Sequence, residues 1–311
     1  MSATRTGYAT TSERGLRWDS VPMRLWQKAK RLGTWDPQRF DLTRDAEDWA
    51  RFTPVEKEFI LRTVALFQAG EEAVTLDLLP LIETIAAEGR IEEELYLTSF
   101  LWEEAKHVEF FRRWLDDVAD ARGDLWGYVT PSYEALFTDE LPRSMQALRT
   151  DRSPAAQIRA STTYNMIIEG VLAETGYRGF RQSLQANGLL PGLLEGITLV
   201  ARDESRHIRY GVYLLNRLIA TTPDGWDIMN ARMNELLGPA MGVVAEFWDH
   251  FDAEDPPFGQ QMQTFMEVAS SLFDRRMKVL ERDRGKGLAD IERATLDDIA
   301  ADPELAEATP A

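Results

Sequence analysis

Two short stretches of the sequence, Glu104-Ala105-Lys106-His107 and Glu204-Ser205-Arg206-His207, repeat one pattern at an interval of 100 residues. In each stretch the glutamate and the histidine stand three residues apart, so on an α-helix both side chains lie on one face. A single metal ion can therefore take a carboxylate oxygen and an imidazole nitrogen from one helical turn. A lone Glu-x-x-His motif is a weak signal, but its repetition with similar flanking residues is hard to obtain by accident.

Two further glutamates precede these stretches at a similar interval, because Glu71 and Glu169 are 98 residues apart. Each glutamate falls within a series of apolar residues at helical spacing, as Glu71 does between Phe67 and Val74. A buried carboxylate without a partner is costly, so four of them that face one interior require a shared cation. The sequence thus predicts a dinuclear metal site inside a four-helix bundle. Its predicted ligands are Glu71, Glu104, His107, Glu169, Glu204 and His207.

The composition restricts the choice of metal. The chain has no cysteine, which excludes disulfides, thiolate zinc sites, iron–sulfur clusters and cysteine nucleophiles. Its only histidines are His107, His207 and His250. Oxygen-rich ligation with two imidazoles suits iron or manganese, and two divalent ions would balance four carboxylates. The bridging pair is open between Glu71 with Glu204 and Glu104 with Glu169. His250 has no other candidate ligand beside it and is expected to be structural or exposed.

The charge balance bears on partners. With 35 Lys+Arg against 52 Asp+Glu, the formal net charge is −17, which argues against binding to nucleic acid or to an anionic membrane. No run approaches the roughly 18 consecutive apolar residues of a transmembrane segment, and residues 1–18 contain no apolar signal core. A cytoplasmic location is therefore expected. The run Glu92-Glu93-Glu94 is expected to be a solvated helix face.

Helix signals are frequent and strand signals are scarce, which predicts an all-α fold. Thr53-Pro54-Val55-Glu56, for example, is typical of a capped helix start. The predicted helices cover residues 53–89 (bent or ended early by Pro80), 90–122, 132–148, 153–186, 191–222, 226–251 and 258–284. Helices of about 30 residues span roughly 45 Å, so the bundle is long. We predict an N-terminal arm and capping segment over 1–52, a dimetal helical bundle domain over 53–284 and an acidic, mobile tail over 285–311.

At these residues the sequence resembles the ferritin-like dimetal-carboxylate superfamily, and more closely the ribonucleotide reductase small-subunit group. It is most similar to the ligand-binding oxidases within that group. The resemblance covers about residues 14–280. It is strongest at residues 70–74, 103–107, 161–165 with Glu169-Gly170, and 203–207. It implies a ferritin-like four-helix bundle with additional helices.

For such oxidases the resemblance implies one manganese and one iron, with two irons as the alternative. It also implies reaction with dioxygen, C–H oxidation, a bound long-chain fatty acid near the metals, a homodimer and a tyrosine–valine ether cross-link. Val74 and Tyr164 occupy the cross-link positions. Tyr164 would not share a face with Glu169 on a regular α-helix, so a π-bulge is expected between them. Asp203 matches a residue that hydrogen-bonds a ligand histidine, and Tyr177 is expected to line the pocket.

Other functions stay open. The first alternative is the radical-generating small subunit of a ribonucleotide reductase. The second is a ferritin-like metal-storage bundle, and the third is a bundle filled with zinc. Many reductase subunits have a radical tyrosine four residues after the first histidine ligand, where this chain has Phe111, although some reductases also have phenylalanine there. Reductase subunits also carry a tyrosine in a C-terminal segment, whereas no tyrosine follows Tyr213. These departures disfavour the reductase role.

Overall fold

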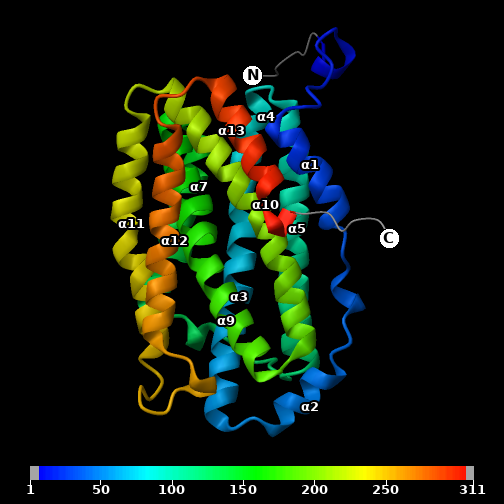
Figure 1. Ribbon diagram of the computed structural model, residues 1–311, viewed down its shortest axis with the longest axis vertical. Helices are drawn as coiled ribbons and strands as arrows, with labels where there is room; N and C mark the ends of the chain where they lie inside the picture. Colours follow the sequence, from blue (N-terminus) through cyan, green and yellow to red (C-terminus); the bar gives the residue numbers. More distant parts are fainter. Residues whose placement is uncertain (1–6, 306–311) are drawn as a thin grey trace.

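The computed structural model describes residues 7–305, and within that range the chain contains helices but no strand, as predicted. The long helices run alongside one another down the long axis of the molecule (Figure 1). The α-helices of the described residues, long and short, are α1 (Val21–Leu32), α2 (Thr43–Arg51), α3 (Pro54–Asp77), α4 (Leu79–Ala87), α5 (Ile91–Asp117), α6 (Pro131–Glu134), α7 (Leu141–Gln146), α8 (Pro154–Ser161), α9 (Glu174–Asn187), α10 (Pro191–Thr221), α11 (Gly225–Trp248), α12 (Met262–Asp283) and α13 (Leu288–Ala301), and the π-helices are η4 (Ala135–Glu140) and η6 (Thr162–Ala173). None of the helices described is both long and apolar enough to cross a bilayer.

Four helical segments form the centre of the bundle. Helix α3 packs against α5, while α10 packs against both η6 and α5. Helices α1 and α13 pack on α10 from outside, and α11 and α12 pack on η6. The interior of the bundle is therefore lined by the inner faces of α3, α5, η6 and α10.

Local chemistry sets the helix ends near the predicted positions. The Thr53 hydroxyl accepts a hydrogen bond from the Glu56 amide at 3.3 Å, and the Glu56 carboxylate accepts one from the Thr53 amide at 2.8 Å. Helix α3 ends at Asp77 and α4 begins at Leu79, so the predicted interruption near Pro80 is confirmed. Helix α9 ends where Gly188 takes a left-handed conformation with φ of 63°.

The predicted π-bulge between Tyr164 and Glu169 is confirmed and extends over the whole of η6. A π-helix bonds each amide to the carbonyl five residues earlier, so residues five apart lie nearly above one another. This winding brings Tyr164 and Glu169 to the same side, and both side chains are buried. The wider turn therefore allows the phenol and the carboxylate to share the interior.

The predicted mobile tail is corrected, because most of it forms helix α13, which packs on α10 and α1. Ile291 and Ile299 of α13 are buried. Asp302, just beyond α13, forms an ion pair with Arg209 at 2.9 Å. The acidic, Ala- and Pro-rich composition of its end suggested mobility, yet widely spaced apolar residues are enough to dock a helix on an existing bundle. The end of the predicted tail, residues 306–311, lies outside the described residues.

The expectation of a solvated face over Glu92-Glu93-Glu94 was wrong for two of the three residues. Glu92 is 1% exposed and pairs with Arg14 at 2.9 Å. Glu93 is equally buried and accepts hydrogen bonds from Tyr210 at 3.0 Å and Arg217 at 3.2 Å. The charges of Glu92 and Glu93, which were expected to face solvent, are thus compensated by residues that are distant in sequence.

The N-terminal arm belongs to the bundle and contains α1 and α2, for which no helix was predicted. Asp45 of α2 is fully buried and caps the start of α10. Its carboxylate accepts hydrogen bonds from the backbone amides of Gly192 and Leu193, both at 2.8 Å, and from the Trp114 indole at 3.0 Å. The arm thereby satisfies the free amides at the start of a metal-site helix.

Replacing Asp45 with alanine leaves those donors buried and unpaired, so we expect Asp45→Ala to lower the free energy of unfolding by about 3 kcal/mol. Glu47→Ala, at an exposed position of the same helix, is the matched control and should change it by less than about 0.5 kcal/mol. Urea unfolding followed by circular dichroism measures both values. Equal effects of the two substitutions would contradict the capping role.

Candidate metal centre

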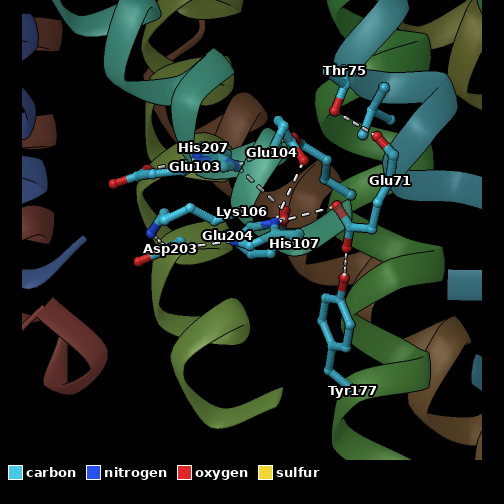
Figure 2. Close-up of polar contacts among 12 residues, drawn as sticks. Glu71, Thr75, Glu103, Glu104, Lys106, His107, Tyr177, Asp203, Glu204 and His207 are labelled. Carbon is cyan, nitrogen blue, oxygen red and sulfur yellow. Dashed lines mark hydrogen bonds and ion pairs between the residues drawn. The ribbon is translucent and has the colours of Figure 1, made fainter. Parts of the chain in front are cut away.

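Each of the four central segments carries a predicted ligand on its inner face. Glu71 comes from α3, Glu104 and His107 from α5, Glu169 from η6, and Glu204 and His207 from α10. All six residues are at most 5% exposed. Figure 2 shows several of them converging from neighbouring helices. The structure therefore brings together every metal ligand named from the sequence.

The six side chains form two overlapping groups that can each hold one metal ion. In each group of four, one ligand atom from every residue lies within 4.8 Å of the others. The groups are Glu71, Glu104, His107 and Glu204, and Glu104, Glu169, Glu204 and His207. Glu104 and Glu204 are the shared residues, so neither bridging pair considered from the sequence matches this geometry.

The positions of the two histidines explain this sharing. His107 Nδ1 lies 3.5 Å from Glu104 Oε2 on its own helix and 3.4 Å from Glu204 Oε1 on α10. His207 Nδ1 lies 3.3 Å from Glu104 Oε1 and 3.6 Å from Glu204 Oε2. Each of these two glutamates thus faces the histidine of its own helix and that of the opposite helix.

Unpaired buried atoms show that the site fits cations. Glu104 Oε2, Glu169 Oε1, Glu204 Oε2 and His207 Nδ1 are buried and have no hydrogen-bond partner among the described residues. Buried polar atoms are nearly always paired, and an unpaired carboxylate oxygen is especially costly. All four atoms are electron-pair donors directed at one interior. Metal cations can accept these electron pairs, whereas the described residues offer these four atoms no hydrogen-bond donor.

The electrostatics agree with this fit. Burial raises the pKa of Glu71 to about 8, and the nearby carboxylates of Glu104 and Glu204 add to the rise against the influence of His107. Burial likewise raises the pKa of Glu169 well above its usual range. Burial alone would lower the pKa of His107, but the Glu71 carboxylate and neighbouring acids raise it well above the ordinary value. Without cations the cluster therefore retains protons, which bound metal ions would displace.

The other ring nitrogen of each histidine faces an acid one residue before a ligand glutamate. His107 Nε2 lies 3.4 Å from Asp203 Oδ2, and His207 Nε2 lies 2.9 Å from Glu103 Oε2. An Nε2–H donated to a carboxylate leaves the Nδ1 lone pair directed at the metals. Asp203 lies where the resemblance placed it, whereas Glu103 was not identified from the sequence.

Buried cations balance these two acids. Lys106 Nζ donates to Asp203 at 2.9 Å, and Arg206 donates to both Glu103 and Asp203. Burial raises the pKa of Asp203, but Arg206, the His107 hydrogen bond and Lys106 together hold it well below the usual range. The 100-residue repeat pairs Glu103 with Asp203 and Lys106 with Arg206, so it could have revealed this layer.

Two further residues near the site had no sequence signal. The Trp35 indole, from the N-terminal arm, donates to Asp203 at 2.8 Å. Asn165 Nδ2 donates to Glu169 Oε2 at 3.0 Å. Both contacts orient acids of the site. His250, in contrast, is exposed, as expected.

Two tyrosines reach the carboxylates. The Tyr164 hydroxyl lies 3.2 Å from Glu104 Oε1 and 3.2 Å from the backbone oxygen of Val74. The Tyr177 hydroxyl donates to Glu71 (Figure 2). Burial raises the pKa of both phenols well above the usual value, and nearby carboxylates add to this, so both are protonated at neutral pH.

A cavity of about 130 Å³ adjoins the carboxylates. Glu71, Glu104, Glu169 and Glu204 form part of its lining, together with Val74 and Tyr177. The rest is largely apolar and includes Leu66, Phe67, Phe137, Ile168, Leu172, Phe180, Val243, Phe247 and Phe265. We call it the apolar cavity. It offers a hydrocarbon environment that ends at the metal-binding oxygens.

The family model described as ribonucleotide reductase, small chain, matches residues 22–283. A variant of an R2-like ligand-binding oxidase with an aerobically reconstituted Mn/Fe cofactor is 37% identical, with a TM-score of 0.85 over 89% of this chain and 98% of that one. Another variant, reconstituted anaerobically, is 38% identical, with a TM-score of 0.82 over 88% of this chain and 98% of that one.

The acids behind the histidines give a test of the site. We expect Glu103→Gln and Asp203→Asn each to weaken binding of Mn(II) or Fe(II) by about 10–100-fold, because the histidine loses the acceptor that orients it. Glu109→Gln, at an exposed position of α5, is the control and should leave the affinity unchanged. Competition with a chromophoric chelator measures these affinities. Wild-type affinity in both variants would contradict the orienting role, provided that thermal unfolding shows both to be folded.

Proposed function

The chain belongs to the ribonucleotide reductase small-chain family and, within it, to the R2-like ligand-binding oxidases, and from this membership we propose a dioxygen-activating oxidase with one manganese and one iron. One observation carries the proposal: four buried carboxylates and two imidazoles form two ligand sets that share Glu104 and Glu204. When bound, such a metal pair supplies the reduction of dioxygen and the power to remove hydrogen from an unactivated C–H bond.

The protein's own part is to hold and insulate the ligands. His107 and His207 keep their Nδ1 atoms toward the interior because their Nε2 atoms face acids on the opposite helix. Both ligand sets contain three glutamates and one histidine, so their composition does not distinguish manganese from iron. The assignment of a mixed pair therefore rests on the related oxidases, and a di-iron centre is the alternative. The homodimer and the cytoplasmic location stay predictions.

The surroundings of Phe111 favour the oxidase over a tyrosyl-radical subunit. The Phe111 ring is fully buried and stacks on Phe67 with ring centroids 5.3 Å apart. This position, four residues after His107, therefore has no hydroxyl group that could be oxidised. Hydroxyls next to the ligands belong instead to Tyr164 and Tyr177.

We further propose that the apolar cavity holds a long-chain fatty acid whose carboxylate faces the metals. Aromatic and aliphatic side chains surround most of the cavity, so burial of a hydrocarbon chain there is favourable at about 25 cal/mol per Å². Among residues 7–305 the lining carries no arginine or lysine that could pair with the head group. The metal end is the part of the lining suited to a carboxylate.

Extraction of the purified protein should release about one long-chain carboxylic acid per chain, identified by mass spectrometry. Ala173 lines the apolar cavity, so Ala173→Phe fills part of it and should reduce the extracted amount severalfold. Metal content, measured on the same samples, serves as the control and should be retained. A variant that keeps both metals and the full amount of lipid would contradict the proposed location.

The proposed internal reaction joins the Val74 β-carbon to the Tyr164 oxygen. It breaks the Val74 Cβ–H and Tyr164 O–H bonds and forms one C–O bond. The two protons and two electrons released go to dioxygen, the oxidant of the proposed activity. Proximity supports this step, because the Tyr164 hydroxyl lies 3.2 Å from the Val74 backbone oxygen and both side chains are buried beside Glu104. Their burial also protects a reactive intermediate state from water.

Peptide mass spectrometry after metal loading tests this reaction. Exposure to dioxygen should produce a linked Val74–Tyr164 peptide pair that has lost two hydrogens, whereas anaerobic loading should not. Tyr164→Phe should abolish the product. Tyr133→Phe, which alters another cavity tyrosine, should not. Unlinked peptides from fully metal-loaded, aerobically treated wild-type protein would refute the cross-link without removing the dimetal oxidase assignment.

A further inference from the structure

A second cavity, of about 350 Å³, reaches the metal centre from another side. It lies where α9, α10 and α12 pack together, beside the segment that follows α13. Its lining is rich in arginine, and we call it the arginine cavity. The arginines are Arg178, Arg181, Arg209, Arg275 and Arg276.

The concentration of positive charge is unusual for a chain with a net charge of −17. Among the lining residues that the structure describes, the acids are the metal-site residue Glu204, Glu174 and Asp302. Arg178 and Arg276 share Glu174, while Arg209 pairs with Asp302. Five guanidinium groups thus line the cavity with three carboxylates, those of Glu174, Asp302 and Glu204, and Arg209 has a second acidic neighbour in Asp298 at 3.8 Å.

Two of these arginines differ in how the fold holds them. Arg276 is only 6% exposed, and its Nε donates to the Gly170 carbonyl at 3.1 Å. A Cβ at Gly170 would lie 2.8 Å from that nitrogen, so the glycine allows the close approach. Arg275 is exposed and forms no ion pair or hydrogen bond within residues 7–305. One arginine is therefore held in place, and its neighbour is available to a ligand.

The electrostatic consequence appears at Arg276. Burial lowers its pKa to about 10, and the repulsion from Arg275, Arg209 and Arg178 adds to this against the attraction of Glu174. An anion bound in the cavity would relieve that repulsion.

The arginine cavity is also connected to the chemistry. Glu204 and Tyr177 line both the arginine cavity and the apolar cavity, so these two side chains form the wall between them. Glu204 belongs to both ligand sets, and Tyr177 hydrogen-bonds Glu71. A molecule anchored among the arginines therefore lies one side chain away from the metal ligands.

We propose that the arginine cavity binds the phosphate group of a small molecule. Guanidinium groups match the geometry of oxyanions and bond them through paired N–H groups. A phosphate monoester carries nearly two negative charges at neutral pH, which suits the five arginines better than a single carboxylate does. The oxidase would thereby have a docking site for an anionic reactant that is separate from the apolar cavity. The binding itself does not depend on the proposed oxidase function.

Calorimetric titration of the metal-loaded protein with methyl phosphate at constant ionic strength tests this site. We expect saturable binding that weakens about tenfold or more in the double variant Arg178→Gln, Arg275→Gln. The matched control, Arg122→Gln with Arg293→Gln, removes the same charge at exposed positions outside the cavity and should change the affinity less than about twofold. Equal weakening in both double variants, or no saturable binding by the wild type, would overturn the proposal.

A second variant predicts the opposite sign. Asp302 competes for Arg209, so Asp302→Asn should strengthen methyl phosphate binding severalfold, whereas Asp255→Asn, at an exposed position outside the cavity, should not. Metal-free protein should bind with the same affinity as metal-loaded protein. Binding that requires the metals, or acetate binding as tight as methyl phosphate binding, would show that the cavity is not a phosphate site.

Discussion

Mutual repulsion among four buried carboxylates is the constraint on which this structure depends. Placed on four different helical segments, these groups would push the bundle apart if they were charged and unpaired. Burial raises the pKa of Glu71 and Glu169, the neighbouring carboxylates add to the rise, and oxygens of Glu104 and Glu204 are left unpaired. Cations at the centre would attract all four carboxylates and so outweigh the repulsion among them. Folding and metal binding are therefore coupled.

The surrounding layer explains how this centre is kept rigid. Each histidine is oriented by an acid on the opposite Glu-x-x-His helix, so the positions of α5 and α10 determine both rings. The N-terminal arm contributes to this arrangement, because Trp35 donates to Asp203 and Asp45 caps α10. Segments without a metal ligand therefore support the ligand geometry. The family match, from residue 22 to residue 283, includes these supporting segments.

Features with a local signal could be predicted from the sequence. The capping residues predicted the helix start at Thr53. The proline ring, which cannot continue a regular helix, predicted the break near Pro80. Helical spacing predicted the six ligands. The π-helix followed from the five-residue interval between Tyr164 and Glu169. Features that depend on distant partners could not be predicted. Glu92 was expected to be solvated and Glu103 was not identified, because Arg14 and Arg206, which neutralise them, lie 78 and 103 residues away. The helices α1, α2 and α13 are short or compositionally ordinary, and packing on the bundle decides their structure.

Anomalous diffraction at the manganese and iron absorption edges, from one crystal of protein loaded with both metals, tests the central claim most directly. The account predicts two ordered ions inside the bundle, both contacted by Glu104 and Glu204. One is also bound by Glu71 and His107, and the other by Glu169 and His207. The two edges should show different occupancy at the two positions. A single ion, zinc alone, or ions bound away from these six side chains would contradict the account.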